Sequence, residues 1–91
     1  MSRPLFSLGQ IVATPGALEV IEKNFINWET LLTRHVTGDW EGVDPEDVKE
    51  NNLSVKQGYR ILSSYGQGEQ KLWIITEADR SVTTILRPDD Y

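Results

Sequence analysis

His35 is the side chain in this sequence best suited to acid–base chemistry, and it is the single histidine among 91 residues. Because imidazole exchanges protons near neutral pH, a histidine at the end of a helix can serve as a general acid or base. Arg34 precedes it, and the turn-rich segment Gly38-Asp39-Trp40 follows. The structural alternative is that His35 caps the helix end by donating to a backbone carbonyl. The lack of an adjacent serine or aspartate favours that alternative.

A second polar candidate is the loop Thr76–Ser81, in which two acids and an arginine could bind a cation or a partner. Two carboxylates alone make a poor magnesium site, and a solvated turn with an ion pair worth under about 1 kcal/mol is the simpler interpretation. The chain contains no cysteine, which excludes disulfides, thiolate metal ligands and cysteine nucleophiles. Phosphate-binding glycine loops and zinc-binding histidine motifs are also absent, so we expect neither a metal nor a cofactor.

The aromatic residues point to a partner rather than to a reaction. Tryptophan, tyrosine and arginine are the residues that protein interfaces use as anchors. We expect Trp28 to be buried, because it begins an apolar stripe at helical spacing, and Trp40 to be the exposed anchor of the following loop. Arg34, Asp39 and Arg80 are the charged residues that we expect to accompany Trp40 in binding a partner.

Three β-rich runs close the chain, over residues 58–65, 71–77 and 82–87, and short polar turns separate them. This spacing predicts an antiparallel meander with a tight hairpin turn at Gln67–Gln70. Side chains alternate along a strand, and each face of these runs mixes apolar with hydroxyl or charged groups. The open face could therefore hold a phosphodiester, although threonine pairs and arginine–glutamate pairs ordinarily stabilise a sheet.

A short strand over 8–14 and a helix over 17–22 precede the meander. Thr14 can cap that helix and Pro15 can fill its first position. The apolar face of the helix is expected to consist of Leu18, Ile21 and Phe25.

Asn27 can cap a second helix over 28–36. Asp44 and Pro45 can start a third, acidic and mostly solvated helix, which we expect to be interrupted at Asn51-Asn52. The order of elements predicts one α+β domain over residues 1–91, with residues 1–7 loosely ordered. It has a short N-terminal strand, two to three helices and then a three-stranded antiparallel meander, with the helices on one face of the sheet.

The net charge of −5 disfavours RNA as a partner, because phosphate contacts depend on lysine and arginine. No apolar run approaches the roughly 20 residues that span a bilayer, and the N-terminus lacks the apolar region of a secretory signal. We therefore expect a cytoplasmic protein that has no membrane contact and whose partner is another protein.

Four segments carry a resemblance to known proteins: Gly9–Leu18, Arg34–Trp40, Trp73–Ser81 and Thr83–Leu86. Over nearly the whole chain they resemble a small, uncharacterised bacterial family whose genes are often found near plasmid and phage genes. The resemblance implies a mobile-element or host-defence context, and it brings no established activity.

The order of helices and meander is similar, at the level of architecture, to the barnase, colicin-type and RelE-like ribonuclease fold. Those enzymes cleave RNA without a metal, using a base, a cation on the phosphate and a hydroxyl. The resemblance implies that His35, Arg60 and either Thr83 or Thr84 would take these roles, with Thr84 as our choice. The acidic charge of this chain departs from that group, as does the lack of a second histidine or a catalytic glutamate.

Our leading expectation is therefore a small accessory protein that acts by binding another protein. A metal-free ribonuclease is the alternative. A homodimer formed through an edge of the sheet is the third hypothesis.

Overall fold

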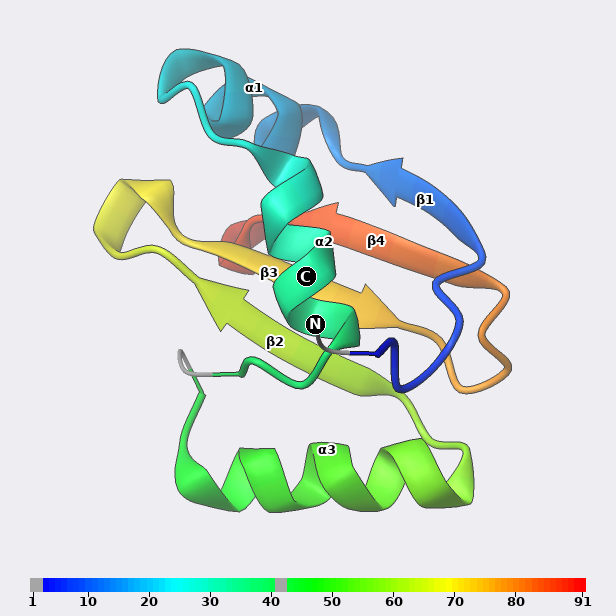
Figure 1. Ribbon diagram of the computed structural model, residues 1–91. Helices are drawn as coiled ribbons and strands as arrows, with labels where there is room; N and C mark the ends of the chain where they lie inside the picture. The colour runs from blue at the N-terminus through cyan, green and yellow to red at the C-terminus, as the bar shows by residue number, and fades with distance from the viewer. Residues whose placement is uncertain (1–2, 41–42) are drawn as a thin grey trace.

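The computed structural model describes residues 3–40 and 43–91, and its centre is a four-stranded sheet. The order of strands across the sheet is β1-β4-β3-β2, as Figure 1 shows. β2, β3 and β4 pair antiparallel, whereas β1 pairs parallel with β4. The strands are β1 (Gln10–Ala13), β2 (Ile61–Tyr65), β3 (Leu72–Thr76) and β4 (Val82–Leu86).

The expected meander is present, but it is only part of a mixed sheet. β1 joins β4 as a parallel strand, with Val12 opposite Thr84. Alternation along a strand reveals its two faces but not its neighbours, which is why the sequence did not predict this pairing. The connection between β2 and β3 contains a short 3₁₀ helix at Gly68–Gln70 instead of the tight hairpin turn that we predicted.

In the described residues, three α-helices lie between β1 and the meander. Thr14 caps the first by accepting from the Ala17 N–H, and Asn27 caps the second by accepting from the Thr30 N–H, as predicted. None of these helices has the length and apolar character needed to cross a membrane. The helices are α1 (Pro15–Lys23), α2 (Trp28–Val36) and α3 (Pro45–Gln57).

The helix α3 runs through Asn51 and Asn52 without the interruption that we expected. Asn51 is buried and directs its side-chain amide at the backbone of Leu62 on β2, so it does not compete with the helical hydrogen bonds. Gly58 ends the helix in the left-handed conformation that glycine adopts most easily, with a φ of 77°.

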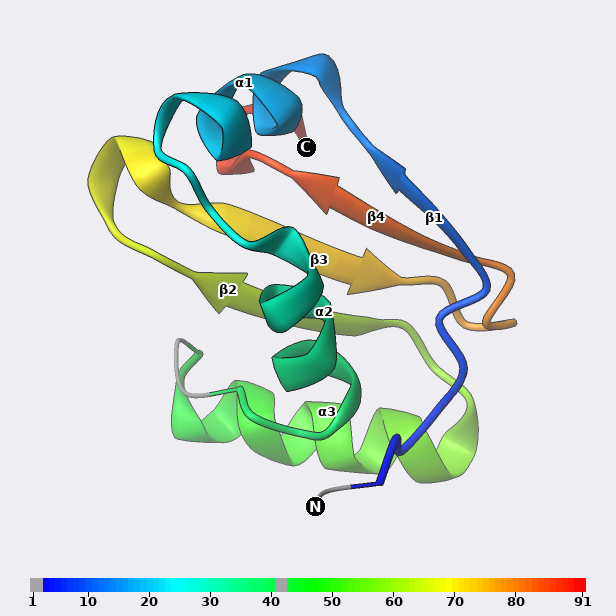
Figure 2. The ribbon, with the colours of Figure 1, turned by 45° about the horizontal axis from the view of Figure 1, so that its top comes forward.

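Figure 1 and Figure 2 show that α2 crosses one face of the sheet while α3 runs along the outer side of β2. α1 packs at the end of the sheet where β1 and β4 meet. The core lies between α1, α2 and the sheet. It consists of Ala17, Val20, Leu32, Tyr65, Leu72, Ile74 and Ile85.

The buried face of α1 is not the one that we predicted. Ala17 and Val20 are buried, whereas Leu18 is 54% exposed and Phe25 is 94% exposed. The small side chain of Ala17 lets α1 approach the sheet closely, and Phe25 lies beyond the end of the helix with a positive φ of 53°. The face of α1 that packs on the sheet is therefore rotated away from the face that carries the largest apolar residues.

Two tryptophans also differ from expectation. Trp28, which we expected to be buried, is 40% exposed at the first position of α2. Trp40, which we expected to be the exposed anchor, is only 3% exposed. Its indole Nε1–H donates to the carbonyl of His35 at 2.9 Å, so its one polar group is satisfied and the ring can be buried.

Candidate functional site

His35 lies on the inner face of α2 and is completely buried. Its Nδ1 is hydrogen-bonded to the hydroxyl of Ser63 on β2, and its Nε2 lies 2.9 Å from Oγ1 of Thr76 on β3. The ring of Phe6 packs edge-on against the imidazole, with 5.3 Å between centroids. Both ring nitrogens are therefore engaged within the protein, and neither faces solvent.

The hydroxyl contacts continue across the sheet. Oγ1 of Thr76 lies 2.7 Å from Oγ1 of Thr83 on β4. Thr83 in turn donates its hydroxyl proton to the carbonyl oxygen of Leu8, also at 2.7 Å. This chain of contacts links α2 through β2, β3 and β4 to the segment that precedes β1, and we call it the His35 network.

The direction of these hydrogen bonds assigns the tautomer of His35. Since Thr83 donates to a carbonyl, Thr76 must donate to Thr83, and Thr76 can then only accept from the Nε2–H of His35. Nδ1 is left as the acceptor for the Ser63 hydroxyl. Every proton in the network is committed, and the imidazole that fits this arrangement is the neutral one.

Burial, and to a smaller extent the positive charge of Arg80, lower the pKa of His35 from 6.5 to about 4. His35 is therefore neutral near pH 7. A general base must reach a proton on its substrate, and here no solvent-facing nitrogen is left to do so. The geometry supports a structural role for His35.

The other two predicted catalytic residues do not join His35. Alternation along β2 and β4 places Ser63 and Thr83 on the face that α2 covers, so Arg60 and Thr84 lie on the opposite side of the sheet. Arg60 is exposed there and contacts Glu77 at 3.2 Å. Of the two threonines considered, only Thr83 is linked to His35, by hydrogen bonds through Thr76. No common cleft contains the predicted catalytic set.

The residues predicted to accompany Trp40 hold the fold locally. Nε of Arg34 pairs with Oδ2 of Asp39 at 2.8 Å, and the guanidinium lies 4.6 Å from the ring centroid of Tyr65. The Tyr65 hydroxyl donates to the carbonyl of Asp39 at 2.9 Å. These contacts fasten the loop after α2 to the end of β2.

Arg80 likewise stabilises the fold, at the opposite end of β2. Its guanidinium donates to three carbonyl oxygens, at 2.9 Å to Ser54, 2.7 Å to Tyr59 and 3.1 Å to Glu77. It also lies 5.4 Å from the ring centroid of Phe6. Arg80 therefore ties the end of α3 to the loop between β3 and β4.

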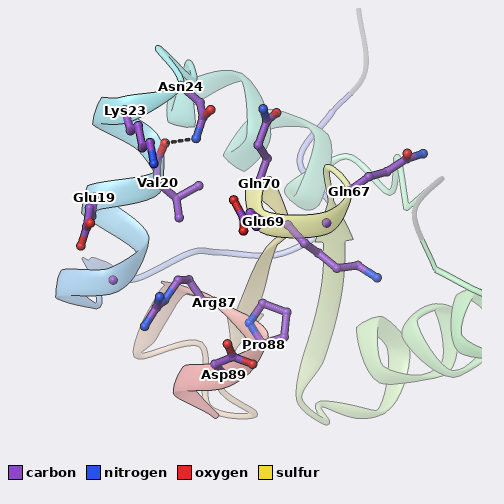
Figure 3. Close-up of a pocket in the computed structure, with 13 residues that line it drawn as sticks. Glu19, Val20, Lys23, Asn24, Gln67, Glu69, Gln70, Arg87, Pro88 and Asp89 are labelled. Atoms are coloured by element: carbon purple, nitrogen blue, oxygen red, sulfur yellow. Dashed lines mark hydrogen bonds between the residues drawn. The ribbon is translucent and has the colours of Figure 1, made fainter.

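One hollow in the described residues is polar and lies away from His35. It measures about 660 Å³, and Figure 3 shows side chains from α1 and from the two 3₁₀ helices around it. Its cations and acids balance, and Arg87 is held by Asp90 at 3.1 Å. The described residues contain no group of acids, histidines or cysteines arranged to hold a metal ion. The charged residues that line the hollow are Glu19, Lys23, Glu69, Lys71, Arg87 and Asp89.

A second hollow is apolar and lies beside β1. It measures about 280 Å³ between β1, α1 and α2, and we call it the β1 groove. Three residues that line it are unusually exposed for their size, namely Leu18, Trp28 and Ile11 at 54%, 40% and 43%. The residues of the β1 groove are Ile11, Val12, Ala13, Leu18, Ile21, Trp28 and Ile85.

The sequence contained a signal for this groove that we read differently. Leu18 and Trp28 belong to apolar helical stripes, and we assigned both to the core. Only the position of α1 and α2 at the β1 end of the sheet leaves them at the surface.

Comparison of the chain with protein-family models, curated proteins and solved structures finds no match.

Proposed function

We propose that this protein acts by binding another protein, and that the β1 groove is part of the binding surface. The observation that carries the proposal is the exposure of Leu18, Trp28 and Ile11 around one apolar hollow. Large apolar side chains gathered at one place on a small domain are typical of interaction sites. Contact of this apolar surface with water is unfavourable, so a partner that covers the surface is bound more tightly.

The closed His35 network supports binding over catalysis. A metal-free ribonuclease needs its base, its cation and its hydroxyl around one phosphate. His35 is buried between α2 and the sheet, whereas Arg60 is exposed on the far side of the sheet. The net charge of −5 also opposes the approach of RNA.

We place the interaction in the cytoplasm, in a mobile-element or host-defence context. The lack of cysteine is compatible with a reducing compartment. The context rests on the resemblance of four segments to the bacterial family encoded near plasmid and phage genes.

The proposal is tested by capture from a lysate of the source cells. The intact chain is immobilised and exposed to lysate that has been treated with nuclease, and the retained proteins are identified by mass spectrometry. We expect one or a few proteins to be retained by the wild type. Leu18→Glu should lose them, because it puts a charge into the apolar surface.

The matched control is Leu53→Glu. Leu53 is 51% exposed on α3, which is far from the groove, so this variant should retain the same proteins. Recovery of RNA without any protein from untreated lysate, or no retained protein at all, would contradict the proposed function.

A further inference from the structure

The two edges of the sheet differ in a way that bears on the partner. On the β2 edge, Oδ1 of Asn51 accepts from the Leu62 N–H at 3.3 Å, and its Nδ2 donates to the Leu62 carbonyl at 2.7 Å. The amide therefore makes the pair of bonds that a neighbouring strand would make. α3 covers this edge along its length, as Figure 1 shows, and further strand pairing there is blocked.

The β1 edge has no such cover. The N–H groups of Gln10 and Thr14 point toward β4, donating to Ser81 at 2.9 Å and to Ile85 at 3.0 Å. Backbone groups alternate in direction along a strand, so the N–H and C=O groups of Ile11 point away from β4, into open space. Those of Ala13 follow the same alternation. In the described part of the chain, no element lies on that side of β1 (Figure 2).

β1 is short, at four residues, but it carries none of the other devices that protect an exposed edge. Natural edge strands usually carry a lysine, a proline, a bulge or an inward charge. β1 reads Gln-Ile-Val-Ala, with no charge and no proline, and its four residues pair with β4 in unbroken register. An open edge of this kind favours the addition of another strand.

The β1 groove lies where a side chain of the added strand would go. Ile11 and Ala13 point to the face of the sheet that carries the helices, where they line the groove with Leu18 and Trp28. An added strand continues the same pleat, so its alternate side chains point to the same face. The volume of about 280 Å³ accommodates an aliphatic side chain, and the lining is entirely uncharged.

Charge decides between two occupants of this edge. Glu22 lies one turn after Leu18 on α1, Glu29 follows Trp28 on α2, and both acids are exposed. A second copy of the chain would bring the same acids and a further net charge of −5. A segment flanked by lysine or arginine would instead be attracted to this rim.

We infer that β1 receives an extended segment of a partner protein as a fifth strand. The segment has uncharged β-branched or aliphatic residues at its centre, one of which fills the β1 groove, and basic residues at its ends. This inference rests on the proposed function and specifies the kind of partner and the mode of binding.

The test uses the intact chain and a library of random twelve-residue peptides displayed on phage. We expect selection to enrich peptides with an apolar β-branched centre and basic ends. The affinity of a selected synthetic peptide is then measured by fluorescence anisotropy. Ile11→Lys should weaken it by at least about tenfold, since the lysine charge is placed against an apolar strand and basic flanks, whereas Leu53→Lys should leave it within about twofold.

A change in the peptide tests the strand pairing without altering the fold of the protein. Two adjacent central amides are N-methylated in turn, since only one of them faces β1, and methylation of that one should weaken binding by about tenfold or more. In amide hydrogen exchange, the bound peptide should slow exchange at Ile11 and Ala13 above that of neighbouring exposed amides.

Several outcomes would overturn the inference. They are enrichment of acidic peptides, equal binding by Ile11→Lys, and no effect of N-methylation. A stable dimer in light scattering that Ile11→Lys disrupts would assign the edge to a second copy instead.

If the lysate partner is retained equally by wild type and Ile11→Lys, strand addition is wrong while the binding function stands. If no protein is retained at all, the proposed function itself fails.

Discussion

At the scale of single residues, the most informative side chain is His35. A buried polar group costs free energy unless its hydrogen bonds are made, and the His35 network makes them for one imidazole and three hydroxyls. Ser63, Thr76 and Thr83 come from three different strands. The histidine thus specifies how α2 sits on the sheet, because a shift of either would leave donors and acceptors unpaired.

The lowered pKa of His35 predicts a specific loss of stability in acid. Between pH 6.5 and about 4 the unfolded chain binds a proton at His35 that the folded chain excludes, so stability falls as the pH falls through this range. Each tenfold change in proton affinity is worth about 1.4 kcal/mol, so the loss reaches about 3 kcal/mol. Above pH 6.5 both states hold a neutral imidazole and this contribution no longer changes.

Urea denaturation of the wild type and of His35→Gln between pH 7.5 and 4 measures this effect. The variant cannot titrate at this position, so the difference in unfolding free energy between the two isolates His35 from the carboxylates. We expect the wild type to be the more stable at pH 7.5 and to lose most of its advantage by pH 4. A difference that stays constant over this range would show that His35 has the same pKa in the folded and the unfolded chain.

At the scale of elements, the contact between α3 and β2 depends on one side chain. α3 is acidic and has few apolar residues, and its buried members are Asn51 and Ser54. Ser54 offers its carbonyl to Arg80, and Asn51 pairs with the backbone of Leu62. The helix is therefore attached to the sheet mainly by hydrogen bonds, and these are directional where hydrophobic contacts are not.

Asn51→Asp is expected to destabilise the protein by about 1–3 kcal/mol. The aspartate keeps an acceptor for the Leu62 N–H, but it turns a second oxygen toward the Leu62 carbonyl, where Nδ2 donated before. Asn52→Asp, at the exposed neighbouring position, is the matched control and should change stability by less than about 0.5 kcal/mol. Thermal unfolding followed by circular dichroism compares the two, and equal stabilities would contradict this account of α3.

At the scale of the whole molecule, the two ends of the chain hold each other. β1 completes the sheet beside β4, the last strand. The Thr14 hydroxyl donates to Asp90 at 2.7 Å. The hydrogen bond from Arg87, and after it the one from Thr14, lowers the pKa of Asp90 to about 2. The start of α1 is therefore bound to the end of the chain. We expect cooperative unfolding in one step, because neither half completes the sheet alone.

Gly9 is the position where this closure is most sensitive. Its φ is +66°, and a Cβ there would collide with the backbone carbonyl oxygens of Arg80 and Ser81. Gly58 has a similar φ of +77°, but a Cβ there would meet no atom within 4 Å. The two glycines share the conformational requirement and differ only in the approach of another backbone.

Gly9→Ala should therefore cost clearly more than Gly58→Ala. Gly58→Ala, the control, is destabilised only by the left-handed conformation, which costs about 1–2 kcal/mol for alanine. Gly9→Ala has this cost too, and it also forces β1 away from β4. Chemical denaturation gives both values, and hydrogen exchange should show faster exchange in β1 and β4 for Gly9→Ala alone. Equal costs for the two variants would mean that the close approach of Gly9 to the backbone of Arg80 and Ser81 has no effect on stability.

The sequence alone predicted the features that depend on interactions between residues close together in the chain. The caps at Thr14 and Asn27, the start of α3 at Pro45 and the three strands of the meander depend on residues close together in the chain. Periodicity and capping are short-range properties, so a single sequence contains them. The α+β class and the order of elements followed from these features.

Only the tertiary structure decided which residues meet. The parallel pairing of β1 with β4, the burial of Trp40 and the exposure of Trp28 and Leu18 depend on where elements distant in sequence come to lie. His35 is the clearest case, since its partners Ser63 and Thr76 are 28 and 41 residues away. An imidazole in the sequence has the chemistry of a base. Its surroundings determine whether that chemistry is available, and here burial and committed hydrogen bonds make it part of the core.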